Sequence, residues 1–148
     1  MDKKTFMRLW AIPLDIEKRA RRIAQLEQLQ ADGPQTVSDV VKSSSGEGNA
    51  TIICNATIRG ADSDYIARER LISEMKAAQV SSRKAYAEGV RLIEGCDNPA
   101  VRTTLQVVCL EGGSYKDAAA ECHLKGIPAG PDALRKQVKR WLESQNLV

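Results

Sequence analysis

Four basic residues fall within one short stretch that has helical periodicity: Arg135, Lys136, Lys139 and Arg140. The stretch 131–142 carries a net charge of +3, and its cations form two like-charged pairs one helical turn apart. Each such pair destabilises an isolated helix by roughly 0.2–0.5 kcal/mol. A polyanion offsets this repulsion, because each Lys or Arg that neutralises a phosphate releases condensed counterions. The pattern therefore has two interpretations, a helix that lies against a polyanion and a solvated basic face on an ordinary helical domain.

The residues that could perform catalysis lack the spacing that catalysis needs. The sequence has no carboxylate pair at useful spacing and no glycine-rich phosphate loop, and its single histidine, His123, has no evident base or nucleophile partner. We therefore expect no enzymatic activity, no catalytic residue and no cofactor.

The cysteines predict buried thiols and no metal site. They form no CxxC pair, and the adjacent Cys122 and His123 would point to different faces of a helix. We expect all of them to be reduced and most of them to be buried. The four are Cys54, Cys96, Cys109 and Cys122.

Three short helices are predicted in the last third of the sequence. Asp97 or Asn98 can cap the first, with Pro99 at its first position, and Ser114 can cap the second. Pro131 begins the third, which carries the basic residues. The expected apolar faces are Val101, Leu105, Val108 and Cys109, then Tyr115, Ala118, Ala119 and Cys122, then Leu134, Val138, Trp141 and Leu142. Small residues on the second helix and cations on the third are typical of a helix-turn-helix unit.

Two longer helices are predicted earlier in the chain. Residues 14–31 have a narrow apolar stripe, which consists of Ile16, Ile23, Leu26 and Leu29. Residues 62–95 contain no proline and place Tyr, Ile or Gln at every seventh position from Tyr65 to Ile93. We expect the two helices to pack together as a hairpin or coiled coil and to support self-association. The seam is irregular, because Gln79, Ser82 and Gly89 stand where large apolar residues would be expected.

The segment between these helices has a different amino-acid composition. Residues 43–48 are rich in Ser and Gly, and β-branched residues follow around Asn55. This composition suits a short strand or hairpin and equally a mobile connector. The predicted fold is therefore mainly α, with a helical hairpin and oligomerisation region at 1–96, a connector at 33–61, and a helix-turn-helix domain at 97–148.

The order of several motifs resembles that of a known family. "NPAVRTTLQVVCLEGGSYKDAAAEC" is similar to the stretch that enters the helix-turn-helix of sigma-factor region-4-like proteins encoded by phages and prophages. "GPDALRKQVKRWLE" resembles the end of the recognition helix in one branch of these proteins, and "SDVVKSSSGEGNATIICNATIRGAD" resembles the segment that follows their helical leader. The turn "HLKGIPAGP" departs from the family in its additional prolines. The resemblance implies a phage or prophage regulator of gene expression that binds DNA, often as an activator.

We accordingly expect double-stranded DNA as the partner, with RNA polymerase as a second candidate. Arg135 and Lys136 are expected to reach base edges, whereas Lys139 and Arg140 are expected to meet phosphates. Ser114 and Lys116, at the start of the second helix, would add backbone contacts. The alternatives are a DNA-packaging protein similar to a small terminase subunit and a helical protein–protein adaptor.

No stretch approaches the roughly 18 apolar residues that a membrane span needs, and the first residues lack the features of a secretory signal. We therefore expect a cytoplasmic protein, in a bacterial host cell, with no membrane partner.

Overall fold

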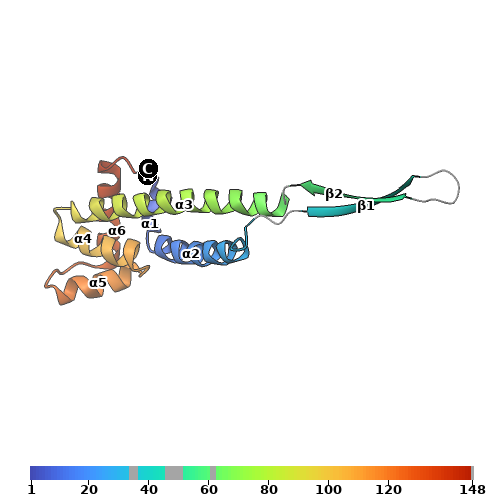
Figure 1. Ribbon diagram of the computed structural model, residues 1–148. Helices are drawn as coiled ribbons and strands as arrows, with labels where there is room; N and C mark the ends of the chain where they lie inside the picture. Colours follow the sequence, from blue (N-terminus) through green and yellow to red (C-terminus); the bar gives the residue numbers. More distant parts are fainter. Residues whose placement is uncertain (34–36, 46–51, 61–62, 148) are drawn as a thin grey trace. The chain divides into compact units, whose positions relative to one another are not determined.

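The computed structural model describes residues 1–33, 37–45, 52–60 and 63–147, and for the two strands it describes the backbone. The described chain is mainly helical, as predicted (Figure 1). Its elements are α1 (Lys3–Met7), α2 (Ala11–Leu29), β1 (Val37–Ser45), β2 (Ile52–Gly60), α3 (Ser63–Glu94), α4 (Pro99–Leu105), the π-helix η1 (Gln106–Leu110), α5 (Tyr115–Leu124) and α6 (Pro131–Ser144).

The chain forms two compact units that do not follow the order of the sequence. One unit comprises Met1–Ala20 and Ala78–Val148, and the other comprises Arg21–Ala77. The first unit thus combines the predicted 97–148 domain with residues from both ends of the predicted 1–96 region. That 97–148 folds as an independent domain stays a prediction.

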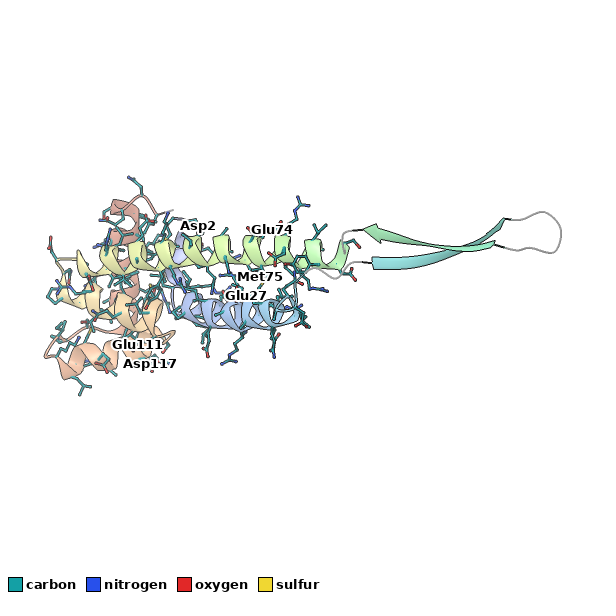
Figure 2. The ribbon with its side chains drawn as sticks, in the orientation of Figure 1. Asp2, Glu27, Glu74, Met75, Glu111 and Asp117 are labelled. Carbon is teal, nitrogen blue, oxygen red and sulfur yellow. The ribbon has the colours of Figure 1, made fainter. Side chains whose placement is uncertain are left out.

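In the unit 21–77, α2 and α3 share a small apolar cluster. Ile23 and Leu26 of α2 pack with Ile72 of α3, and Met75 lies against them between the two helices (Figure 2). Outside this cluster, Lys76 Nζ forms an ion pair with Glu27 Oε1 at 2.7 Å.

The residue that directly follows α2, Gln30, is buried in place of the expected Leu29. Leu29 is 64% exposed, so its assignment to the apolar stripe was wrong, whereas Gln30 is 7% exposed. Gln30 Nε2 donates to the Tyr65 carbonyl at 2.9 Å, and Gln30 Oε1 accepts from Arg68 Nε at 2.6 Å. These bonds satisfy the buried amide, which would otherwise be costly to desolvate.

The connector contains a two-stranded antiparallel ribbon. β1 pairs with β2 from Val37 opposite Gly60 to Ser45 opposite Ile52 (Figure 1). Of the two interpretations of this connector, the strand interpretation is the one observed for the described residues.

In the larger unit, the polar seam positions of α3 have specific partners. Gln79 is 5% exposed; its Nε2 donates to the Ile16 carbonyl at 2.9 Å, and its Oε1 accepts from Arg19 Nη1 at 2.8 Å. The same Arg19 nitrogen donates to Ser82 Oγ at 3.1 Å. These residues form a hydrogen-bonded polar layer where the sequence pattern lacks large apolar side chains.

Residues 1–12, which we call the leader, complete the core of this unit. Asp2 caps α1, because its Oδ1 accepts from the Thr5 backbone N–H at 3.1 Å. Phe6 and Leu9 are fully buried, and the Phe6 ring lies 5.7 Å, centroid to centroid, from that of Trp141. They share a core with Ile93, Cys96, Val101, Leu105, Cys109, Val138, Leu142 and Leu147.

Gly89 allows the leader to approach α3 closely. A Cβ built on this glycine would lie 2.6 Å from Leu9 Cδ2, so a larger side chain would overlap Leu9. The absence of a side chain at this position is therefore a packing requirement, and it explains the third irregularity of the seam.

We expect Gly89→Ala to lower the free energy of unfolding. Overpacking costs about 1–3 kcal/mol, which exceeds or cancels the roughly 0.8–1 kcal/mol that Ala gains over Gly in a helix. Urea denaturation followed by circular dichroism measures the change. In a Leu9→Ala background the same substitution should instead be neutral or stabilising. Equal destabilisation in both backgrounds would contradict the assigned contact.

Candidate nucleic-acid interface

The first two helices of the predicted helix-turn-helix region begin with the expected caps. Asn98 Oδ1 accepts from the Ala100 backbone N–H at 3.0 Å, and Pro99 takes the first helical position. Ser114 forms a capping box with Asp117: its hydroxyl accepts from the Asp117 backbone N–H at 3.2 Å, and its own backbone N–H donates to Asp117 Oδ2 at 2.9 Å. Both predicted caps are confirmed.

The segment between α4 and α5 differs from the predicted regular helix. Residues 106–110 form a π-helix, in which Glu111 N–H donates to the Gln106 carbonyl at 3.1 Å. Gly112 then ends the helix at φ +72°, a conformation that glycine adopts at little cost. The π-helix changes which residues are buried: Val107 and Cys109 are buried, whereas Val108, which was predicted on the apolar face, is only partly buried.

The helices α4, α5 and α6 pack on one another around small side chains. Ala118 and Cys122 of α5 are fully buried against Leu134 of α6, which is also fully buried. Ala100, Val107 and Ala119 complete this cluster. The small residues of α5 let the neighbouring helices come close, as the sequence pattern predicted.

A Schellman motif ends α5 and begins the turn to α6. Gly126 has φ +75° and donates to the His123 carbonyl at 3.0 Å, and Ile127 N–H donates to the Cys122 carbonyl at 2.7 Å. Pro131 then starts α6, whose cap Gly130 makes no side-chain hydrogen bond.

The two faces of α6 differ sharply. Leu134, Val138 and Leu142 are between 0 and 3% exposed, whereas all four predicted cations, Arg135, Lys136, Lys139 and Arg140, are exposed. The structure therefore brings these four predicted contact residues together on the accessible side of one helix, together with the exposed Asp132 and Glu143.

Arg135 is held by two neighbours that the sequence did not suggest. Its guanidinium carbon lies 5.0 Å from the centroid of the Tyr115 ring, and its Nη1 lies 3.6 Å from Asp132 Oδ1. Burial raises the pKa of the Tyr115 phenol, so this residue presents a neutral ring to the arginine. Tyr115 also packs against both apolar clusters of this unit, as predicted, so its contact with Arg135 adds to its place on the apolar face.

The two predicted contacts at the start of α5 are both exposed, but they differ in their hydrogen bonds. The Ser114 hydroxyl donates to Asp117 Oδ2 at 3.0 Å, in addition to accepting from the Asp117 backbone N–H. The hydrogen bonds from Ser114 hold the pKa of Asp117 below its ordinary value (Figure 2 shows Asp117 on α5). The negative charge of Asp117 thus lies at the helix end where a phosphate would bind. Ser114 acts as a structural cap, and Lys116 is the freer of the two.

Among the residues that the structure describes, no group of three or more His, Cys, Asp or Glu side chains is arranged to hold a metal ion. None of the described helices combines the length and apolar character needed to cross a bilayer.

No family model matches the chain, and comparisons with curated proteins and with solved structures gave no similar protein.

Cys109 and Cys122 should react slowly with thiol reagents in the folded protein. Both are fully buried, and burial raises the pKa of Cys109 to about 12, which suppresses the reactive thiolate. Mass spectrometry after a timed exposure to iodoacetamide measures the modification of each cysteine. Labelling at the same rate with and without denaturant would show that the assigned core is incorrect.

Proposed function

We propose that this chain is a phage or prophage transcriptional regulator that binds promoter DNA through a helix-turn-helix formed by α5 and α6. The observation that carries the proposal is the division of α6 into a buried apolar face and an exposed face with Arg135, Lys136, Lys139 and Arg140. Two like-charged pairs on a solvated helix are unfavourable, and a phosphate backbone offsets that repulsion.

The packing of α6 suits entry into the major groove. The groove is about 12 Å wide, and a helix with its side chains is about 10–12 Å across. The apolar face of α6 is anchored by Leu134 and Val138, so the opposite side would meet the DNA. In this arrangement Arg135 and Lys136, in the first turns, reach base edges, and Lys139 and Arg140 reach phosphates.

The contacts of Arg135 favour a role in base recognition. Stacking on Tyr115 restricts the guanidinium, which lowers the entropy lost when it forms a two-bond contact with guanine. The competing Asp132 carboxylate is an exposed partner at 3.6 Å, and exposed pairs contribute only about 0–1 kcal/mol. DNA would therefore displace this carboxylate at little cost.

Substitution of the α6 cations should separate base contacts from phosphate contacts. Lys139→Ala and Arg140→Ala should each weaken binding to all duplexes and lower the salt slope by about 0.9. Arg135→Ala should cost roughly 1–3 kcal/mol, mainly on the preferred site. Fluorescence anisotropy with preferred and random duplexes over a NaCl series measures both effects.

Lys84→Ala serves as the matched control for these variants, because it removes one exposed cation from α3. It should leave the salt slope unchanged. If the α6 variants bind like the wild type, α6 carries a solvated basic face, and the adaptor function is favoured. If DNA binding persists together with a ring-shaped assembly and capture by a large ATPase subunit, the DNA-packaging function is favoured.

We also propose that the protein self-associates through its long helices. The long helices leave the side chains of Leu29, Ile66 and Val80 at least half exposed, and a second copy of the chain would remove this apolar surface from water. Light scattering at tens of micromolar protein should show a dimer or a larger species. A strict monomer under those conditions would contradict the proposal.

A further inference from the structure

The leader reaches the turn between η1 and α5 through Trp10. The Trp10 backbone N–H donates to the Cys109 carbonyl at 2.7 Å, which gives a partner to one of the last carbonyls of η1. The indole packs against Gly112, where a Cβ would come within 3.2 Å of Trp10 Cδ2. The backbone bond and the ring contact together fix the leader beside the turn 111–114.

Arg8 is positioned by the same tryptophan. Its guanidinium carbon lies 5.8 Å from the centroid of the Trp10 ring, and its side chain is exposed. Tyr115 holds Arg135 in the same way, so two arginine–aromatic pairs flank the turn that leads into α5. Gly112, beside Trp10, and Tyr115 are three residues apart, so their Cα atoms are separated by at most about 10 Å. The two guanidinium groups are therefore closer than one turn of B-DNA, about 34 Å.

A second cation accompanies Arg8. Lys4 precedes it by one helical turn, and the two side chains line one groove of about 390 Å³ with Thr5, Ala11, Ile12 and Asp15. The groove combines two cations and a hydroxyl with a single carboxylate. This combination of side chains suits a phosphate.

We propose that Lys4 and Arg8 form a second phosphate-contact surface for the DNA bound by α6. The inference rests on the proposed function, since it needs a duplex on the basic face of α6. In this arrangement Arg135, which stacks on Tyr115, contacts base edges. Arg8, which stacks on Trp10, contacts the sugar–phosphate backbone. The leader thereby contributes to DNA binding as well as to the core.

The test is a salt titration of the full chain with a fluorescein-labelled random-sequence duplex. Lys4→Gln and Arg8→Gln should each lower the slope of log K against log salt by about 0.9, and the double variant by about 1.8. Arg8→Lys should keep the wild-type slope, because it keeps the charge. Lys84→Gln removes an equal charge from the surface of α3 and should not change the slope.

Thermal unfolding of each variant, followed by circular dichroism, separates binding from folding, since exposed side chains should leave Tm unchanged. Wild-type slopes for Lys4→Gln and Arg8→Gln, together with a lowered slope for Lys139→Ala, would overturn this inference and leave the proposed function intact. Wild-type slopes for all of these variants and for Arg140→Ala would instead refute DNA binding by α6. A lowered slope for Lys84→Gln equal to that for Arg8→Gln would show that only net charge matters and would overturn the leader contact.

Discussion

The close approach of Leu9 to α3 is the contact on which the larger unit depends. It is possible only because residue 89 is a glycine, which leaves room for an isobutyl group where any Cβ would collide. With Leu9 in place, Phe6 reaches Trp141 and joins the core beside α4 and α6. A segment of about a dozen residues thus connects helices that are distant in the sequence, and removal of either buried side chain would leave a cavity that costs several kcal/mol.

The orientation of the basic helix follows from this core. α6 is anchored by Val138 and Leu142 in the cluster that contains Phe6, and by Leu134 in the cluster that contains the small residues of α5. Because these two clusters bury the apolar side of α6, its cationic side is the one that faces solvent. Leu147, buried after a Schellman turn at Asn146, fixes the other end of the helix. A rigid helix of this kind loses little entropy when it binds, which favours affinity.

Sequence patterns predicted those features that local chemistry determines. Caps such as Ser114 and the apolar face of α6 follow from hydrogen bonding and periodicity within one helix. The cap was confirmed, and Leu134, Val138 and Leu142 of the predicted face are buried, whereas Trp141 is only partly buried. Gln79 and Gly89 looked like defects, because their partners, Ile16, Arg19 and Leu9, lie about 60 to 80 residues away in sequence. The pairing of Arg135 with Tyr115 was missed for the same reason, since it depends on how two helices meet. Predictions of contact with DNA depend on a partner outside the chain and stay predictions.

Hydrogen–deuterium exchange with and without duplex DNA locates the DNA-bound surface along the whole chain. We predict that DNA slows exchange in peptides that cover α6 and the start of α5, and in the peptide that contains Arg8, while peptides from Arg21–Ala77 keep their rates. Slower exchange confined to α2, α3 or the β1–β2 ribbon, with α6 unchanged, would contradict it.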